Sequence, residues 1–357
     1  MDINARIELV KQVGEEILTE EELKHLLQTK EHPVAYDGFE PSGTDVHIAQ
    51  GILRAINVNK MTKAGIKFKM LVADWHGWAN NKLGGDLEKI QTVGHYMIEV
   101  WKHCGMDLKN VEFIWVSDYV KDPEYWKKVM QVARNSTINR IVRTGQIMGR
   151  KEADVQQASQ ILYPCMQAAD IFQLKADICQ LGMDQRKVNV LAREIGPSIG
   201  FWKPVVISHH MLMGLGDPPK SKEIDRVVDL KMSKSKPDTA IFMNDSEEEV
   251  KRKILKAYCP AKIAEDNPML EYSKYLIFEK FNVMEIKRPE KFGGDIVIEN
   301  YAELERLYSE GKIHPQDLKS TVLHYLNEMI KPVRESFHKD SRLSKLLETI
   351  RKFEVTR

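Results

Sequence analysis

Short apolar runs alternate with longer amphipathic stretches along the N-terminal part of the chain. The apolar runs, each with the length of a buried strand, occupy residues 34–40, 67–73, 111–116, 176–181 and 204–208. Helix-like segments lie between them. Strands joined by crossover helices are typical of a doubly wound α/β fold with a parallel sheet. In such sheets, ligands bind at the carboxyl ends of the strands.

Helical patterns dominate the two ends of the chain. Residues 1–30 are predicted to form two short helices, and Thr19 opens the second with the spacing of a capping box. A long helical insertion, at about residues 119–160, follows the third predicted strand. After a polar loop at residues 229–240 the pattern becomes mainly helical, with a turn-rich interruption at residues 288–295.

The size of the chain suggests how these parts are divided. At roughly 100–200 residues per domain, its 357 residues indicate two domains, and 43% hydrophobic residues suffice for full cores. We place the boundary near residue 240. This gives an α/β domain over residues 1–240 and a mainly helical domain over residues 241–357.

Composition argues against several classes of protein. The 53 Lys and Arg residues nearly balance the 52 Asp and Glu residues, so any surface for nucleic acid has to be local. The four cysteines stand apart without a CxxC pair, which argues against disulfides and against a metal site. The charged N-terminus lacks the apolar centre of a signal peptide, and no stretch approaches the ~20 apolar residues of a membrane-spanning helix. We expect a soluble, cytoplasmic protein with no resident metal and no membrane contact.

The strongest chemical signal is Lys231-Met-Ser-Lys-Ser235, which follows the last predicted strand. Two lysines three residues apart on a polar loop can close over a polyphosphate and stabilise the charge of a leaving pyrophosphate. A bare KxxK would more often be a solvated loop. The complete five-residue string in this position favours a nucleotide site with Lys231 and Lys234 as its cations.

A second polar pair follows the first predicted strand, where His47 and Gln50 share the first turn of the next helix. Free backbone N–H groups at a helix start attract phosphate, and both side chains can donate hydrogen bonds to it. Taken alone, the pattern also fits an ordinary helix start with one polar face.

A third group of polar residues flanks the fourth predicted strand. Tyr163, Gln167 and Asp170 have the i, i+4, i+7 spacing of one helix face, and Pro164 is predicted to open that helix. A phenol, an amide and a carboxylate on one face suit an amino-acid ligand, although a solvent-facing polar side is the alternative. The polar loop at residues 182–187 follows the strand directly, at the carboxyl edge of the predicted sheet.

Together these motifs resemble the class I aminoacyl-tRNA synthetases, whose signatures are KMSKS and His-x-Gly-His. The second signature is altered here, with Ala49 in place of glycine and Gln50 in place of the second histidine. YDGFEPSG, YPxMQxxD, GMDQRK and AYCPA extend the likeness over most of the chain and resemble the archaeal and eukaryotic branch of the tyrosyl-tRNA synthetases. The resemblance implies a Rossmann-like catalytic domain, a helical anticodon-binding domain and a ligase that joins tyrosine to its tRNA.

Carried over residue by residue, the resemblance implies roles for most of these polar groups. The residues implied for tyrosine are Tyr36, Tyr163, Gln167, Asp170 and Gln185, with Tyr36 and Asp170 at the phenol. Those implied for ATP are His47, Gln50, Lys231 and Lys234 at the phosphates, which also make up the catalytic set, and Asp184 at the ribose. Those implied for tRNA are Arg143, Arg186 and Lys187 at the acceptor stem, and Phe292, His314 and Asp317 at the anticodon. Arg140 is equally well explained as part of a charged, solvated helix.

Hydrogen-bond chemistry supports tyrosine as the amino acid. A buried Asp170 beside the hydroxyl of Tyr36 demands a donor on the ligand ring, and phenylalanine would leave both groups unpaired, a discrimination already known for tyrosyl enzymes. The rival is the tryptophanyl relative, because an indole N–H could also be met by a carboxylate. The match around residues 163–187 favours tyrosine.

The implied reaction needs no nucleophile from the protein. The tyrosine carboxylate attacks the α-phosphorus of ATP, while the protein aligns the reactants and stabilises charge on pyrophosphate. Mg²⁺ is expected to accompany ATP through phosphate oxygens and water. A ribose hydroxyl at the 3′ end of tRNA then attacks the tyrosyl-adenylate.

Two further expectations concern assembly and an alternative function. Family members are homodimers, and the insertion residues Tyr119, Tyr125, Trp126 and Val129 would supply either an interface or core. A synthetase-like protein that only binds RNA is the alternative function, because the His-x-Gly-His signature is altered. The intact lysines and carboxylates of the other motifs favour an enzyme.

Overall fold

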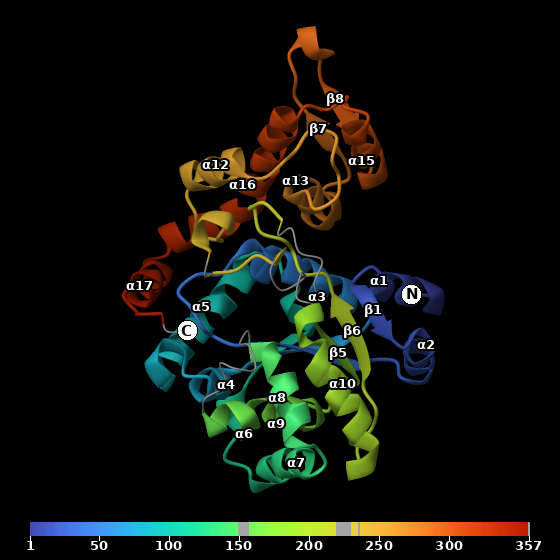
Figure 1. The fold of residues 1–357 in the computed structure, drawn as a ribbon, viewed down its shortest axis with the longest axis vertical. Helices are drawn as coiled ribbons and strands as arrows, with labels where there is room; N and C mark the ends of the chain where they lie inside the picture. The colour runs from blue at the N-terminus through green and yellow to red at the C-terminus, as the bar shows by residue number, and fades with distance from the viewer. Residues whose placement is uncertain (149–156, 219–229, 235, 356–357) are drawn as a thin grey trace.

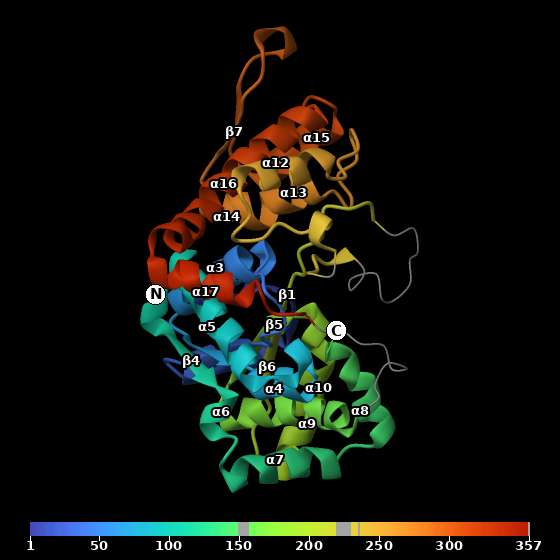
Figure 2. The same ribbon diagram turned by 90° about the vertical axis from the view of Figure 1, so that its left-hand side faces the viewer.

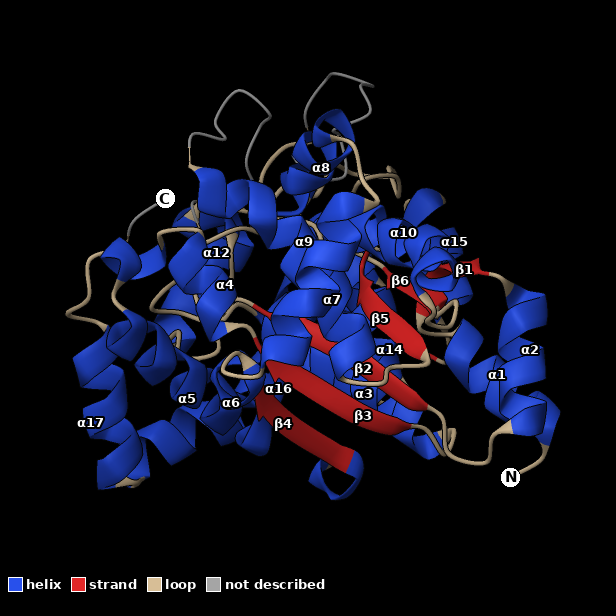
Figure 3. Ribbon diagram, turned by 90° about the horizontal axis from the view of Figure 1, so that it is seen from below, coloured by secondary structure: helices blue, strands red, loops and turns tan. Residues whose placement is uncertain are grey.

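The computed structural model describes residues 1–148, 157–218, 230–234 and 236–355. Its centre is a six-stranded sheet in the order β1-β6-β5-β2-β3-β4, drawn in red in Figure 3. The parallel strands are β2 (Val34–Phe39), β3 (Lys67–Val72), β4 (Val111–Trp115), β5 (Ile178–Gly182) and β6 (Val205–His209). They coincide with the five predicted strands, so the predicted doubly wound α/β fold is confirmed.

The strand that the pattern missed is β1 (Gly14–Leu18), which pairs antiparallel with β6 at the edge of the sheet. It lies between α1 (Ile3–Lys11) and α2 (Glu20–Thr29), so the prediction of two helices over residues 1–30 was incomplete. Two adjacent glutamates make GEEIL look helical. Charged side chains are nevertheless common on edge strands, where they discourage pairing with other chains. The predicted capping box at Thr19 is present.

Neighbouring strand residues bury their side chains on opposite faces of the sheet. Ala35 belongs to one hydrophobic cluster and Tyr36 to the other, as the two-residue period of a strand requires. The helices that cover the faces are α3 (Arg54–Lys63) and α5 (Leu87–His103) on one side, and α7 (Pro123–Arg134), α9 (Ala158–Gln173) and α10 (Arg186–Ile195) on the other. Polar functional groups are therefore concentrated at the carboxyl edge of the strands, where the loops begin.

The predicted helical insertion consists of several short helices ahead of α9. They are α6 (Val116–Tyr119), α7, α8 (Ile138–Thr144) and a 3-10 turn at Gly145–Met148, and residues 149–156 lie outside the described part. Tyr125 and Val129 are buried within the chain, at 0% and 1% exposure. These two side chains therefore form core, which was one of the two roles left open for them.

Pro164 does not open its helix. It lies inside α9, which begins at Ala158 behind a cap formed by Gln157 and Gln160, so the predicted position of Pro164 was wrong. The cap fixes the start of the helix at Ala158, six residues before the position that the preference of proline for a first turn suggests. Tyr163, Gln167 and Asp170 nevertheless share one face of this helix, and all three are buried.

The region after residue 245 is mainly helical, as predicted (Figures 1 and 2). Its helices are α12 (Glu247–Lys256), α13 (Pro268–Tyr272), α14 (Phe278–Lys280), α15 (Tyr301–Ser309), α16 (Pro315–Lys339) and α17 (Ser341–Ile350). A hairpin of β7 (Met284–Ile286) and β8 (Ile296–Ile298) encloses the turn-rich patch, and its three-residue strands were too short to predict. None of the helices in the described residues is long and apolar enough to span a membrane.

Candidate active site

A cavity of about 120 Å³ lies at the carboxyl ends of β2 and β3. Its lining includes all five residues that the sequence assigned to one amino-acid pocket, namely Tyr36, Tyr163, Gln167, Asp170 and Gln185. They come from three separate elements: β2, α9 and the turn at Met183–Gln185. The fold therefore brings together residues that are up to about 150 positions apart in the chain. The lining residues that the sequence did not single out include Glu40, Leu71, His76, Ile147 and Met148.

Asp170 is completely buried and is held by two side chains that the sequence did not assign to it. The hydroxyl of Tyr119 donates to Oδ1 at 2.8 Å, and Nε2 of His76 lies 3.1 Å from Oδ2. The His76 ring in turn meets Tyr163 edge-on, with the ring centroids 4.8 Å apart. A carboxylate can accept several hydrogen bonds. Asp170 is thus oriented by its neighbours and can still accept a hydrogen bond from the hydroxyl of a ligand.

Tyr36 is buried on β2, and its hydroxyl has no hydrogen-bond partner of normal geometry among the described residues. Burial, together with nearby Cys179 and Asp170, raises the pKa of Tyr36 well above its usual value, so the phenol remains protonated. An unpaired buried hydroxyl costs about 1–3 kcal/mol. A ligand that supplies the missing partner would recover that free energy.

Hydrogen bonds between side chains close the other walls of the cavity. Tyr163 donates its hydroxyl to Oε2 of Glu40 at 2.9 Å. Gln167 donates from Nε2 to Oε1 of Gln185 at 3.1 Å, and Gln185 donates from Nε2 to the carbonyl of Ile147, also at 3.1 Å. These bonds connect α9 to the insertion and to the loop after β5, so Tyr163, Gln167 and Gln185 line the cavity with fixed partners, unlike Tyr36 within the described residues.

His47 and Gln50 lie where the chain after β2 enters a π-helical turn at Ala49–Leu53, which continues into α3. The N–H of Gln50 donates to Nδ1 of His47 at 3.3 Å. Burial, with the nearby positive charge of Lys234, lowers the pKa of His47 well below its usual value. The imidazole is therefore neutral at pH 7 and can donate from one ring nitrogen.

The two lysines of the KMSKS string have different surroundings. Nζ of Lys231 lies 2.8 Å from Oδ2 of Asp184. Nζ of Lys234 is buried without a hydrogen-bond partner in the described residues, and burial lowers the pKa of Lys234 to about 8. Its stem passes so close to Gly43 that a Cβ there would lie 3.1 Å from Cδ of the lysine. A buried ammonium without a partner is suited to an anion, and Ser235 lies outside the described residues.

An ion pair that the sequence did not indicate joins α3 to β2 close to His47 and Lys234. Nε of Arg54, on α3, is 2.7 Å from Oδ2 of Asp37, on β2. Burial raises the pKa of Asp37 to about 6, although the charge of Arg54 opposes the rise. Arg54 also contributes to the lowered pKa values of His47 and Lys234. An arginine within an amphipathic helix is usually exposed to solvent. The sequence alone therefore did not indicate that Arg54 forms an ion pair with the buried Asp37.

The residues assigned to the acceptor stem are exposed but engaged. Arg186 forms an ion pair with Glu16, with Nε 2.6 Å from Oε2, and Lys187 contacts the side chain of Gln146. Arg143 is exposed on α8. The Lys187 contact places the start of α10 beside the insertion, so the two basic segments lie on neighbouring elements. No group of three or more His, Cys, Asp or Glu side chains in the described ranges is placed to hold a metal ion.

The residues assigned to the anticodon lie around the hairpin and the start of α16. Phe292 is 61% exposed in the turn between β7 and β8. His314 caps α16 and Asp317 lies in its first turn. Arg288 donates from Nη1 to the carbonyl of Lys312 at 2.8 Å, which ties the hairpin to the loop that leads into α16.

Comparisons with known proteins agree with this geometry. Residues 28–331 match the family model described as tRNA synthetases class I (W and Y). The chain is 50% identical over 359 residues to tyrosine–tRNA ligase 1, cytoplasmic, of Arabidopsis thaliana, covering 100% of this chain and 90% of that protein. It is 42% identical over 364 residues to tyrosine–tRNA ligase of Saccharolobus solfataricus, covering 100% and 99% of the two chains.

Solved structures give the same result. The tyrosyl-tRNA synthetase of Pyrococcus horikoshii, complexed with L-tyrosine, has a TM-score of 0.91 at 38% identity and covers 98% of this chain and 100% of that one. Tryptophanyl-tRNA synthetase of Aeropyrum pernix has a TM-score of 0.66 at 17% identity, with 95% and 85% coverage. The second likeness shows the fold alone.

Proposed function

Because the chain belongs to the class I tRNA synthetases of the tryptophanyl and tyrosyl family, within its tyrosine–tRNA ligases, we propose how its residues activate tyrosine and transfer it to tRNA. The observation that carries the proposal is the cavity that Asp170 and Tyr36 both line, the hydroxyl of Tyr36 having no hydrogen-bond partner of normal geometry in the described part of the chain. The carboxylate of Asp170 accepts a hydrogen bond from the phenolic O–H of tyrosine, and the hydroxyl of Tyr36 donates to the phenolic oxygen. Phenylalanine would leave the Tyr36 hydroxyl without a ligand partner and would place an apolar ring edge against the Asp170 carboxylate with no hydrogen bond in return.

The remaining cavity residues hold the rest of the amino acid. Tyr163, Gln167 and Gln185 surround its ring and ammonium group in this proposal. The hydrogen bond from Tyr163 to Glu40 brings a second carboxylate to the lining, where it favours a cation. The pre-formed bonds between these side chains reduce the ordering that ligand binding would otherwise require.

His47, Gln50, Lys231 and Lys234 form what we call the phosphate edge. In this proposal it binds ATP and stabilises the transition state. Lys234 offers a buried ammonium that has no hydrogen-bond partner among the residues that the structure describes, and neutral His47 offers a hydrogen-bond donor beside it. Gln50 donates from its amide, and Lys231 exchanges Asp184 for phosphate while Asp184 turns to the ribose. Charge that develops on pyrophosphate is then met by groups already in place. Mg²⁺ accompanies ATP through phosphate oxygens and water, which agrees with the donors here being mainly cations and amides.

Amino-acid-dependent ATP–pyrophosphate exchange tests this function directly. With each of the twenty amino acids in turn, tyrosine should support exchange and phenylalanine and tryptophan should not. Exchange with tryptophan instead would overturn the pocket assignment. No exchange with any amino acid, together with intact tRNA binding, would leave the alternative of an RNA-binding protein.

For tRNA, we propose that Arg143, Arg186 and Lys187 contact the acceptor stem and that Phe292, His314 and Asp317 contact the first anticodon base. The exposed ring of Phe292 suits an unstacked base. His314→Ala should lower aminoacylation and leave adenylate formation unchanged. His324→Ala is the control, because His324 is an exposed histidine of the same helix. Equal loss in both assays would instead indicate a defect of folding or of the active site.

Assembly and location complete the proposal. We propose a cytoplasmic homodimer whose catalytic domain spans residues 1–240 and whose anticodon-binding domain spans residues 241–357. Relatives named as cytoplasmic ligases support the location. Sedimentation analysis would test the dimer, and a concentration-independent monomer would contradict it.

A further inference from the structure

The segment that follows the KMSKS string is the direct neighbour of the first signature. His47 and Phe242 form an isolated antiparallel bridge. Backbone hydrogen bonds of 2.9 and 2.8 Å between residues 46–48 and residues 241–243 flank this bridge. The position of His47 is therefore set by residues 241–243 as well as by its own connection to β2.

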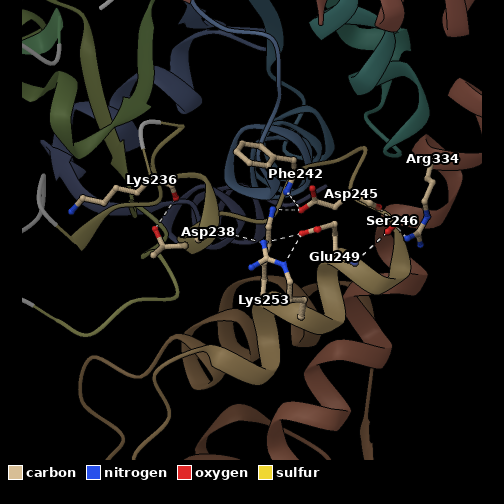
Figure 4. Close-up of polar contacts among 10 residues, drawn as sticks. Lys236, Asp238, Phe242, Asp245, Ser246, Glu249, Lys253 and Arg334 are labelled. Atoms are coloured by element: carbon tan, nitrogen blue, oxygen red, sulfur yellow. Dashed lines mark hydrogen bonds and ion pairs between the residues drawn. The ribbon is translucent and has the colours of Figure 1, made fainter.

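One carboxylate fixes the turn at the end of that segment (Figure 4). Oδ2 of Asp245 accepts the N–H of Phe242 at 2.9 Å and the ammonium of Lys253, on α12, at 2.7 Å. Lys253 is 5% exposed, and its Nζ also lies 4.7 Å from the centroid of the Phe242 ring. Arg334, on α16, donates to the backbone carbonyl of Asp245 at 3.1 Å. Asp245 thus joins the bridge partner of His47 to two C-terminal helices.

A second ion pair in the same region provides a natural comparison. Asp238 lies 2.7 Å from Nη2 of Arg252, which directly precedes Lys253 on α12. The side chain of Asp238 is 79% exposed, whereas that of Asp245 is 13% exposed. Both pairs tie one segment to one helix at the same distance. Only the Asp245 pair is buried and reaches the backbone of the bridge.

We propose that Asp245 is a positioning residue for the ATP side of the reaction. Through Phe242 it holds His47 in place, and through Lys253 and Arg334 it makes that placement depend on the C-terminal helices. The inference rests on the proposed role of His47 at the phosphates. The contacts of Asp245 given above include no residue of the tyrosine cavity, so its effect is confined to ATP.

The test compares Asp245→Ala with the matched control Asp238→Ala in the full-length protein. Loss of a buried, charge-assisted hydrogen bond should raise the KM for ATP in tyrosine-dependent exchange about tenfold. The KM for tyrosine should change less than about twofold, because the tyrosine cavity keeps all its contacts. Asp245→Asn keeps an acceptor for the N–H of Phe242 and should restore part of the affinity for ATP. Asp238→Ala should match the parent.

A double mutant tests the route through His47. If Asp245 acts on ATP by placing that side chain, Asp245→Ala should add little to the KM for ATP in a His47→Ala background. Full additivity would overturn the route. A folded Asp245→Ala protein with parental affinity for ATP, or with equal losses for ATP and tyrosine, would overturn the positioning role.

Two further measurements keep the result decisive. If Asp245→Ala does not fold, Lys253→Met replaces it, because methionine keeps an apolar stem on the Phe242 ring and removes only the charge. Lys253→Met should then raise the KM for ATP while Arg252→Met does not, and equal effects of the two would overturn the proposal.

Direct calorimetric binding of ATP judges the inference separately from catalysis. A parent that binds ATP but exchanges pyrophosphate with no amino acid would overturn the proposed function, and the ATP affinities of parent and variant would still decide the role of Asp245.

Discussion

The cavity proposed for tyrosine and the edge proposed for phosphate each combine paired and unpaired polar side chains. In the part of the chain that the structure describes, they differ in the charge of the unpaired group: a neutral hydroxyl on Tyr36 in the cavity and an ammonium on Lys234 at the edge. In the cavity, Asp170 and Gln167 already have protein partners at 2.8 and 3.1 Å. At the phosphate edge, the ammonium of Lys234 is buried without one among the described residues. Side chains with fixed partners reject a ligand that cannot complete their bonds, whereas an unpaired cation attracts any suitable anion. We propose that the first arrangement serves selectivity and that the second serves binding and rate.

The two regions also differ in the elements that carry them. Four of the five predicted pocket residues lie on the regular elements β2 and α9, whose backbones are fixed by their own hydrogen bonds, and the fifth, Gln185, lies on the turn at Met183–Gln185. The phosphate edge is built on a π-helical turn, an isolated bridge and the KMSKS segment. Its geometry therefore depends on single side-chain contacts such as that of Asp245 with Phe242. Substitutions in the two regions should consequently separate into losses of amino-acid choice and losses of ATP chemistry.

The largest effect is expected from Asp170→Ala. It removes the acceptor for the phenol, and loss of a buried hydrogen bond to a charged group should lower kcat/KM for tyrosine about 10- to 150-fold. The tyrosine-to-phenylalanine ratio should fall as well, because the variant no longer places beside the ligand ring a carboxylate to which tyrosine can donate and phenylalanine cannot. Exchange assays with both amino acids measure this, and a melting curve checks folding. A folded variant that kept the parental ratio would remove Asp170 from the pocket.

At the phosphate edge, Lys231→Ala and Lys234→Ala should each slow adenylate formation more than about tenfold, because each removes a charge that stabilises pyrophosphate. Tyrosine affinity should change little. Single-turnover measurements separate the two quantities. Lys236→Ala is the control, since Lys236 is an exposed lysine of the same segment. Parental rates in both variants would contradict the role proposed for these cations.

The ammonium of Lys234 also predicts a pH dependence confined to the phosphate edge. Its pKa of about 8 lies below the ordinary 10.5, so the free protein loses this charge as pH rises through about 8. kcat/KM for ATP should fall severalfold over that range, and in Lys234→Arg the fall should move to higher pH because guanidinium stays charged.

Stability should change in the opposite direction, because the unfolded chain keeps the Lys234 proton up to pH 10.5. The contribution of Lys234 to stability therefore rises between pH 8 and 10.5. Melting curves of the parent and of Lys234→Met across this range measure the contribution. If kcat/KM for ATP had the same pH profile in the parent and in Lys234→Arg, the titration would belong to another group.

Sequence patterns predicted what depends on local order. Five strands followed from their apolar runs, and helical spacing put Tyr163, Gln167 and Asp170 on one face of α9, while the resemblance to tyrosyl enzymes assigned that face to a pocket. The edge strand β1 escaped because its glutamates suit both a helix and a sheet edge. Pro164 was misplaced because a tertiary context with a cap at Gln157 overrode a local preference.

Contacts between distant segments could not be predicted in the same way. His76 gains its role only when α4 (Asp74–Ala79) packs beside α9 and brings its ring to Asp170. Arg54 looks like a surface residue until β2 supplies Asp37. The partners of these side chains lie on other elements, and no spacing within one segment encodes them.

The smallest effect is expected from Tyr36→Phe, and it distinguishes a pre-formed pocket from a ligand-completed one. The hydroxyl of Tyr36 has no hydrogen-bond partner of normal geometry among the described residues, so its removal should leave the melting temperature unchanged or slightly higher. Tyrosine should lose one neutral hydrogen bond, which lowers its kcat/KM about 2- to 10-fold. Phenylalanine has no group that could form a hydrogen bond with the Tyr36 hydroxyl. The kcat/KM for phenylalanine is therefore the internal control and should not fall. If the melting temperature dropped sharply instead, Tyr36 would already be bonded within the free protein. The cavity would then be complete without ligand, and Asp170 alone would select the phenol.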